Sequence, residues 1–286
     1  MMVSLYQEVR AALRESVFKP KKRLGQHFLI HEGTIGAILR LLDLSPREEV
    51  LEIGPGLGFL TRRLVEAAGK VRAVEVDPFL IQWLRKSPLG SHPGLELIQG
   101  DILKVPLGDI LSGHRVKLVA NLPYNISTPV LFRLFELRDH FSLLVLMVQR
   151  EVAERMAASP GTKSYGTLSI WCQVHGQVLD KVSVSPEAFF PRPKVRSTVL
   201  KIALHREPLL ATERLPALRA LVRAAFGQRR KTLGNALTGW LKKGREEVEA
   251  LLRREGIDPG RRGETLSIEE FIRLAHVLEA RQIAES

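Results

Sequence analysis

A glycine-rich loop between a short strand and a helix most constrains the fold of this 286-residue chain. Residues 49–53 (EVLEI) have the pattern of a strand and run directly into Gly54-Pro55-Gly56-Leu57-Gly58. A helical pattern follows over residues 59–67. Glycines at alternate positions let the backbone approach a ligand closely, and the N-terminus of a helix offers unpaired N–H groups. The segment therefore predicts a strand–turn–helix unit of an open α/β sheet, with a ligand at the turn.

The spacing of these glycines distinguishes two kinds of nucleotide-binding loop. The dinucleotide fingerprint Gly-x-Gly-x-x-Gly would place its third glycine at position 59, where this chain has Phe59. The Gly-x-Gly-x-Gly spacing after an acidic strand instead resembles motif I of the methyltransferases that use S-adenosylmethionine. An NAD-dependent oxidoreductase is therefore a disfavoured alternative.

Two further predicted strands end next to carboxylates. Residues 71–75 end at Glu75, where an acid can hold both ribose hydroxyls of a nucleoside. Residues 95–99 are followed by Gly100 and Asp101, whose carboxylate can accept a hydrogen bond from an adenine amine. Either acid alone is more often a helix cap or a turn residue. A glycine-rich loop, a Glu and a Gly-Asp at three successive strand ends together indicate a nucleoside cofactor.

The segment Asn121-Leu122-Pro123-Tyr124 follows a fourth apolar strand, residues 117–120, so we expect it to line the same crevice. The Asn121 side-chain oxygen and the Leu122 carbonyl can accept the two N–H bonds of an exocyclic amine and aim its lone pair at a methyl donor. Pro123 stiffens the turn, and Tyr124 can stack on a base that has left its helix. Taken alone, these residue types favour an ordinary turn.

Six segments, in this order, resemble the ribosomal RNA adenine dimethyltransferases: QHFL (26–29), EIGPGLG (52–58), GD (100–101), NLPY (121–124), FFPRPKVRS (189–197) and QRRKTL (228–233). The resemblance runs from about residue 19 to the C-terminus. It fits the bacterial small-subunit dimethyladenosine transferases better than the antibiotic-resistance branch that acts on the large subunit, and the QRRKTL segment decides between them. His27 departs from the family, which usually has Asn there, although an imidazole still offers one donor and one acceptor.

The resemblance implies a reaction and a set of site residues. The family transfers four methyl groups from S-adenosylmethionine to two adjacent adenosines in the 3′-terminal hairpin loop of small-subunit (16S) rRNA, so the partners would be this rRNA and the immature 30S subunit. The implied catalytic residues are Asn121, Leu122, Pro123, Tyr124 and Phe189. Phe189 would form a second aromatic wall beside the target base, and core packing of Phe189 and Phe190 is the alternative. The implied cofactor contacts are Gln26, His27, Leu29, Gly54, Gly56, Glu75, Asp101, Ile102 and Asn121.

The charge of the chain agrees with an RNA partner. It has 43 Lys and Arg against 31 Asp and Glu, a formal net charge of +12, which predicts non-specific affinity for phosphate. Aromatic residues make up only 6% of the chain, so we expect shape and phosphate contacts to dominate docking on rRNA. The expected RNA contacts are Lys21, Lys22, Arg23, Lys194, Arg229, Arg230 and Lys231.

The order of patterns predicts an α/β fold with a second, all-α part. Strands beginning near residues 49, 71, 95, 117 and 141 alternate with helices, which implies a parallel sheet with right-handed crossovers. Residues 173–184 and 196–204 are expected to form an antiparallel edge hairpin, as in the seven-stranded, Rossmann-like sheet of class I methyltransferases. Helices alone are expected afterwards, at residues 213–226, 230–241, 245–255 and 268–280. We therefore predict a methyltransferase domain at 1–206, with a basic segment at 1–30, and a helical rRNA-binding domain at 207–286.

Several classes of protein are disfavoured by composition. The single Cys172 excludes an intrachain disulfide and a Cys-rich metal site, and no two His residues have metal-ligand spacing. The longest aliphatic stretch, residues 143–148, is too short to span a bilayer. We expect a cytoplasmic monomer without a metal or a membrane segment. Two alternatives remain beside the rRNA dimethyltransferase: an adenine methyltransferase acting on DNA or another RNA, and a non-catalytic rRNA-binding assembly factor.

Overall fold

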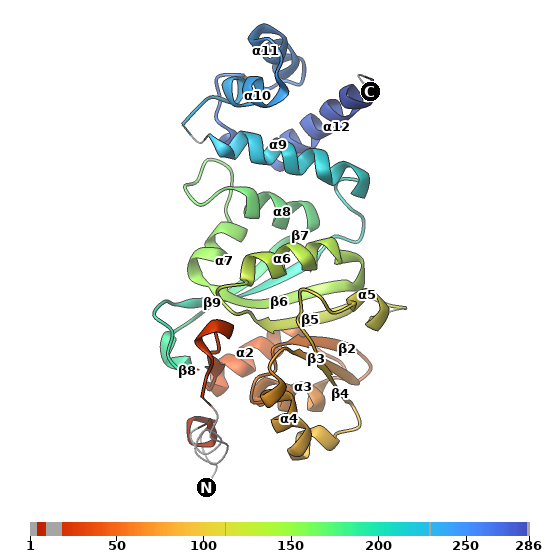
Figure 1. Ribbon diagram of the computed structural model, residues 1–286, viewed down its shortest axis with the longest axis vertical. Helices are drawn as coiled ribbons and strands as arrows, with labels where there is room; N and C mark the ends of the chain where they lie inside the picture. The colour runs from red at the N-terminus through yellow and green to blue at the C-terminus, as the bar shows by residue number, and fades with distance from the viewer. Residues whose placement is uncertain (1–4, 10–18, 112, 229, 285–286) are drawn as a thin grey trace. The chain divides into compact units, whose positions relative to one another are not determined.

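The computed structural model describes residues 5–9, 19–111, 113–228 and 230–284 (Figure 1). The chain forms two compact units. The first comprises Met1–Ala153 and Gln177–Leu204, and the second comprises Glu154–Gly176 and His205–Ser286. Residues 154–176, which the sequence prediction places in the methyltransferase domain of residues 1–206, group with the C-terminal helices in this division.

The first unit is built on a seven-stranded sheet with the strand order β4-β3-β2-β5-β6-β9-β7 (Figure 1). Strands β4, β3, β2, β5 and β6 pair in parallel, and β9 is antiparallel to β6. The chain order reverses between β2 and β5, which is where open α/β sheets bind ligands. The predicted α/β class and seven-stranded sheet are confirmed. The strands are β2 Glu49–Ile53, β3 Lys70–Glu75, β4 Leu95–Gln99, β5 Val116–Asn121, β6 Phe141–Gln149, β7 Gly176–Val184 and β9 Ser197–Leu204.

Helices connect these strands and pack on the sheet. Helix α3 packs on β3, α4 on β3 and β4, and α2 on β6 and β9 as well as on α3. Helix α4 begins sharply because Asp77 caps its N-terminus and Pro78 occupies its first turn. The helices are α2 Glu32–Leu42, α3 Phe59–Ala67, α4 Pro78–Lys86, α5 Leu107–Ile110, α6 Ser127–Glu136 and α7 Arg150–Met156, and the 3-10 turns are η1 Lys22–Leu24, η2 Pro88–Ser91, η3 Arg138–His140 and η4 Pro186–Ala188.

A two-stranded antiparallel sheet joins distant segments of the first unit. Strand β1, Phe28–Leu29, pairs with β8, Phe189–Phe190, so that Phe28 lies opposite Phe190 and Leu29 opposite Phe189. Phe28, Leu29 and Phe189 belong to the buried core that also includes residues of α2 and of the central strands. The QHFL and FFPRPKVRS segments thus lie side by side although about 160 positions separate them along the chain.

The second unit is helical. Helix α9 packs against α8, α10 and α12, and the Phe226 ring stacks on Phe271 with ring centroids 6.0 Å apart. The four predicted C-terminal helices are confirmed, with bounds that shift by a few residues. No helix in the described ranges is both long and apolar enough to cross a membrane. The elements are α8 Thr167–His175, η5 Thr212–Arg214, α9 Leu215–Gly227, α10 Leu233–Leu241, α11 Arg245–Arg254, η6 Gly263–Thr265 and α12 Ile268–Ala284.

The prediction that residues 173–175 begin a strand is wrong, because these residues belong to helix α8. The helix runs to His175, and β7 begins only at Gly176. Buried residues lie on all sides of α8, so its sequence lacks the polar and apolar alternation of a surface helix. Just before α8, Tyr165 donates a hydrogen bond to the Leu266 carbonyl at 2.9 Å, which ties this stretch to the C-terminal helices.

Candidate active site

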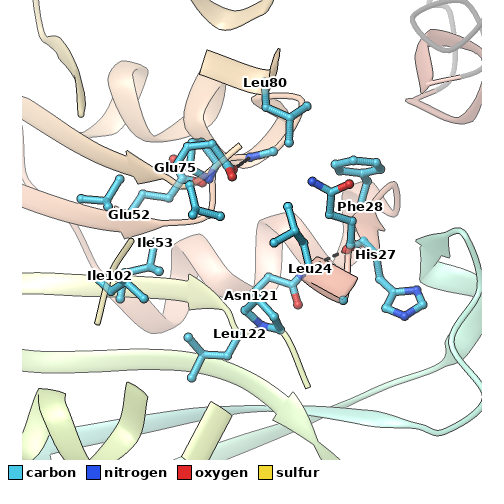
Figure 2. Close-up of a pocket in the computed structure, with 18 of the residues that line it drawn as sticks. Leu24, His27, Phe28, Glu52, Ile53, Glu75, Leu80, Ile102, Asn121 and Leu122 are labelled. Carbon is cyan, nitrogen blue, oxygen red and sulfur yellow. Dashed lines mark hydrogen bonds between the residues drawn. The ribbon is translucent and has the colours of Figure 1, made fainter. Parts of the chain in front are cut away.

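Every predicted cofactor contact and four of the five predicted catalytic residues line one pocket of the first unit. Figure 2 shows Glu52 and Glu75 at one end of this pocket, His27 and Phe28 at the other, and Leu24 and Asn121 between them. The ends of β2, β3 and β5 and the segment from η1 to β1 supply these residues. The strands bring their motifs together because parallel strands end at the same edge of a sheet.

Gly54 opens the floor of the pocket at the end of β2. Its φ of +72° lies in the left-handed region, and a Cβ at this position would meet no protein atom within 4 Å. The Gly54 N–H donates to the Val74 carbonyl at 2.9 Å, which fixes the loop against β3. A side chain here would therefore enter the pocket, in the space where a ligand can approach the backbone.

Glu75 is a buried carboxylate at the end of β3. Its Oε1 accepts the Asp77 N–H at 2.9 Å, and its Oε2 accepts the Gly56 N–H at 3.3 Å. Burial raises the pKa of Glu75, and these backbone hydrogen bonds only partly oppose the effect. Each oxygen keeps a further acceptor position, so the carboxyl group can still bind two neighbouring hydroxyls.

Asp101 and Ile102 form the wall after β4. Asp101 Oδ1 accepts the Leu103 N–H at 2.9 Å, whereas Oδ2 has no partner in the part of the chain that the structure describes. Ile102 is buried and gives this wall an apolar surface. An acceptor beside an apolar surface suits a flat ring with an amine, so these residues fit the adenine of a nucleoside cofactor.

The Asn121 amide is oriented by the backbone of the N-terminal segment. Its Nδ2 donates to the His27 carbonyl at 2.9 Å (Figure 2), which leaves Oδ1 as the group available to a substrate. The Leu122 N–H donates to Met147 O at 3.0 Å, and no described hydrogen bond engages the Leu122 carbonyl. Asn121 Oδ1 and Leu122 O, both in residues that line the pocket, thus have no hydrogen-bond donor among the described residues.

His27 and Tyr124 form a stacked pair at the edge of the pocket. Their ring centroids are 5.5 Å apart with planes at 26°, so His27 covers one face of the Tyr124 ring. His27 Nδ1 lies 2.6 Å from the Pro191 carbonyl, which can only accept, so Nδ1 carries the proton. The Tyr124 hydroxyl is hydrogen-bonded to Ser197 Oγ at 2.7 Å, and burial raises the Tyr124 pKa.

The structure does not place Phe189 at the pocket. The ring is 3% exposed and belongs to the buried core together with Phe28 and Leu29, as the alternative of core packing predicted. Neighbouring side chains of a strand point to opposite faces, so Phe190 is the ring nearer the surface. Phe190 meets Tyr6 edge to face with centroids 5.9 Å apart.

Several residues that line the pocket were not predicted from the sequence, including Leu24, Glu52, Val76 and Met147. Glu52 is 2% exposed, and its Oε2 has no hydrogen-bond partner among the described residues. Burial together with the charge of Glu75 raises the pKa of Glu52 to about 8. Its position two residues before Gly54 in the glycine-rich motif was an available signal. Val76 is 45% exposed in the pocket, and its place directly after Glu75 could have marked it as an apolar ligand contact.

The basic residues predicted to contact RNA differ in their surroundings. Lys21 is already engaged, because its ammonium lies 2.7 Å from Asp77 Oδ1. Arg229 lies outside the described residues, and the RNA-binding role of this whole set stays a prediction. No group of three or more potential metal ligands occurs within the described ranges. The exposed members of the set are Lys22, Arg23, Lys194, Arg230 and Lys231.

Comparison with known proteins agrees with this geometry. A sequence model described as "Ribosomal RNA adenine dimethylase" matches residues 17–280. The chain belongs to the ribosomal RNA adenine dimethylase family. It is therefore an rRNA adenine dimethyltransferase, and its methyl donor is S-adenosylmethionine, as predicted. Membership of this family sets aside the oxidoreductase, the DNA methyltransferase and the non-catalytic assembly factor.

Individual members of the family are similar over nearly the whole chain. Ribosomal RNA small subunit methyltransferase A of Geobacter metallireducens is 44% identical, covering 94% of this chain and 98% of its own length. The protein of that name from Geobacter sulfurreducens is 45% identical with the same coverage. Among solved structures, a dimethyladenosine transferase from Plasmodium falciparum has a TM-score of 0.76, with 28% identity over 90% of this chain and 98% of its own.

A large-subunit enzyme is also similar. The 23S rRNA methyltransferase ErmE has a TM-score of 0.67, with 28% identity over 88% of this chain and 99% of its own. The relatives at 44% and 45% identity are small-subunit proteins, and the Plasmodium falciparum dimethyladenosine transferase has the higher TM-score at the same 28% identity. These comparisons agree with the predicted placement in the small-subunit branch.

Proposed function

We propose that this chain dimethylates the N6 amines of two adjacent adenosines in the 3′-terminal hairpin loop of small-subunit rRNA, acting on the immature 30S subunit. The observation that carries the proposal is the Asn121 amide, which His27 O holds at 2.9 Å so that its oxygen is left for an amine. The small-subunit relatives at 44% and 45% identity support the choice of rRNA.

The pocket residues fit S-adenosylmethionine. Open space over Gly54 admits a ligand against the backbone, Glu75 would bind the ribose hydroxyls, and Asp101 Oδ2 with the Ile102 side chain would bind the adenine. When bound, S-adenosylmethionine supplies an electrophilic methyl group on a sulfonium centre. The chain's own task is to present a weakly nucleophilic amine to that methyl group.

The two acceptor oxygens orient the target amine. The lone pair of an adenine amine is delocalised into the ring, so the nitrogen must move toward tetrahedral geometry before it can attack. Asn121 Oδ1 and the Leu122 carbonyl would accept its two N–H bonds and direct the lone pair away from the ring plane. In each transfer the S–CH3 bond would break as the N–CH3 bond forms, and the amine would release one proton to water. After the first transfer one N–H therefore remains, and one acceptor still orients the nitrogen for the second.

Tyr124 would supply a ring face for stacking and would not act as a general base. Burial raises its pKa, and its hydroxyl is bonded to Ser197, so the phenol is protonated at neutral pH. Its free ring face would stack on the flipped adenine and offset part of the cost of unstacking. The site accordingly works by positioning, with no strong general base.

Docking on rRNA would rest on the basic surface. The exposed side chains of Lys22, Arg23, Lys194, Arg230 and Lys231 are the proposed phosphate contacts. The helical C-terminal part, residues 207–286, is proposed to bind rRNA. A monomer without a metal ion, working beside ribosomes in the cytoplasm, completes the proposal.

Methyl incorporation on three substrates tests the proposed function. Purified protein and labelled S-adenosylmethionine are incubated with immature small subunits, free small-subunit rRNA and duplex DNA. We expect incorporation to be fastest on the immature subunit, at the two adjacent adenosines of the terminal hairpin. A preference for duplex DNA, or for adenosines of large-subunit rRNA, would refute the assignment.

A further inference from the structure

Asp77 lies just outside the pocket, yet its side chain connects the pocket's parts. The carboxylate is fully buried, and Lys21 Nζ donates to its Oδ1 at 2.7 Å. Gln26 Nε2 donates to Oδ2 at 2.9 Å. These contacts span 56 and 51 positions of the sequence. Asp77 therefore ties the N-terminal segment to the end of β3.

A hydrogen bond also joins the two ends of the N-terminal segment, Lys21 and Gln26. Gln26 Oε1 accepts the Lys21 N–H at 2.7 Å, so the Gln26 amide bridges the start of the turn to Asp77. The amide keeps one N–H of Nε2, and this is the group that Gln26 can offer to a ligand in the pocket. Breaking the contact with Asp77 would release both the turn and this donor.

The segment also packs against the motif that holds the target amine. Asn125 Nδ2 donates to Arg23 O at 3.1 Å, and a Cβ at Gly25 would lie 3.0 Å from Asn125 Oδ1 and 3.3 Å from Pro123 Cβ. The φ of +60° at Gly25 is likewise suited to glycine. Little room remains here, so the segment lies directly over the Asn121–Tyr124 turn.

Asp77 is coupled to the predicted ribose site through Glu75. The Asp77 N–H donates to Glu75 Oε1, and the other oxygen of Glu75 accepts the Gly56 N–H. The chain of hydrogen bonds thus runs from the glycine-rich loop through Glu75 and Asp77 to Gln26. Although burial by itself raises the pKa of Asp77, hydrogen bonds from Lys21 and Gln26 outweigh it and hold this pKa below its usual value.

We infer that Asp77 is a positioning residue that latches residues 21–26 over the pocket, so that cofactor affinity depends on a side chain that does not touch the cofactor. The latch makes Lys21 part of the cofactor site rather than a phosphate contact. This inference rests on the proposed function only for the identity of the ligand. It predicts that an open latch lowers the fraction of protein competent to bind, which lowers the apparent affinity by that fraction.

Asp77 also caps helix α4, because Oδ1 accepts the Phe79 N–H at 3.1 Å, and the test must separate the two roles. Asp77→Asn does so. Asparagine caps a helix about as well as aspartate, but it has no charge for Lys21 and turns an N–H group toward the Gln26 amide. Asp77→Ala removes both cap and latch. Glu66→Gln, on the exposed face of α3, is the matched control for loss of one negative charge.

The rate of trypsin cleavage measures how often the latch opens, because Lys22 and Arg23 are trypsin sites within η1. We expect Asp77→Asn to speed cleavage after these residues and to weaken S-adenosylhomocysteine binding about tenfold by calorimetry. The midpoint of thermal unfolding should stay near that of Glu66→Gln. The kcat at saturating S-adenosylmethionine should also stay within about twofold, so that the defect appears in KM.

A thermodynamic cycle completes the test. Lys21→Met should weaken binding less than Asp77→Asn, and the double variant should bind no worse than Asp77→Asn alone. Cleavage rate and cofactor affinity that do not change in Asp77→Asn would overturn the latch. The latch would also be overturned if Asp77→Asn lost as much affinity as Asp77→Ala and its thermal stability fell by the same amount. Cleavage and calorimetry need no RNA, so their failure is distinguishable from failure of the rRNA assignment.

Discussion

Charged groups at the pocket of the first unit are buried and hydrogen-bonded, whereas several basic residues of the second unit are exposed. Glu75 in the pocket and Asp77 just outside it are buried, and each accepts hydrogen bonds fixed within 3.3 Å. In the second unit, Arg230 and Lys231 are exposed, and Arg245 and Arg253 share Glu249 at 2.7 Å and 2.9 Å on the surface of α11. Buried, hydrogen-bonded groups fix the orientation of a ligand, whereas exposed cations attract a negatively charged partner from a distance.

This difference follows from the two tasks. An amine must be turned toward a methyl group within a fraction of an ångström, which only rigid, desolvated contacts achieve. Phosphates of a folded RNA can be met by many side-chain conformations, and their attraction is weakened by salt. Substitutions in the pocket should therefore change chemistry sharply, and substitutions of exposed cations should change binding gradually.

The largest effect is expected from Asn121→Ala. This variant removes an acceptor that acts on the amine near the transition state, so methyl transfer should fall by about 100-fold or more. Single-turnover transfer to immature subunits measures the loss. Calorimetry should show a much smaller loss of S-adenosylhomocysteine binding, because Asn121 also lines the cofactor pocket and its Nδ2 holds His27 O. Equal losses in both would assign Asn121 to the cofactor instead of the amine.

Glu52→Gln should stabilise the protein near neutral pH. The Glu52 pKa is raised from 4.5 to about 8 in the folded state, so between these values the unfolded chain ionises first and wild-type stability falls as pH rises. The variant cannot ionise and should gain on the order of 2 kcal/mol in free energy of unfolding at pH 7. Denaturant unfolding from pH 4 to pH 9 measures this, with the exposed Glu246→Gln as control. A parallel pH dependence in the Glu52 variant and the wild type would contradict it.

Tyr124 separates stacking from hydrogen bonding. Tyr124→Ala loses a base–ring contact of about 1–3 kcal/mol and should reduce kcat/KM for the subunit roughly tenfold or more. Tyr124→Phe keeps the ring, loses only the bond to Ser197, and should stay within about threefold. Steady-state kinetics on immature subunits measure both variants. If the phenylalanine variant were as impaired as the alanine variant, the stacking role would be wrong.

The smallest effect at low salt is expected from the exposed cations. Reversing Arg230 and Lys231 together to Glu should reduce the slope of log affinity against log salt by roughly one unit per lost phosphate contact. Cofactor affinity should not change. Arg245→Glu with Arg253→Glu reverses the same charge on α11, and an equal change there would mean that only net charge matters. Subunit binding at several salt concentrations measures the slopes.

The position of the site could be predicted because parallel strands end at one edge of their sheet. Gly54 and Asp101 lie just after a strand, and Glu75 and Asn121 are the last residues of theirs, so local pattern and one topological rule bring the four together. The contacts between them were not predictable. Asn121 bonds the backbone of a residue 94 positions away, and nothing in the local sequence of either segment marks that pairing.

Two misplaced segments show the limit of local pattern. Phe189 and Phe190 differ only in which face of β8 they occupy, and the register of β8 on β1 decides which ring is buried. Residues 173–175 read as a strand because α8 is buried on nearly all sides. In both places long-range packing, and not the local preference of the residues, determines the structure.

The most direct test of the account is the order of products at the target adenosines. Small-subunit rRNA methylated by the purified protein is digested at successive times, and its nucleosides are measured by mass spectrometry. In this account two acceptor oxygens orient the amine for the first transfer, and one of them suffices for the second. We therefore expect N6-methyladenosine to rise first and then to convert to N6,N6-dimethyladenosine. Product that stops at N6-methyladenosine, or methylation at a ring nitrogen, would contradict the role of Asn121 and Leu122.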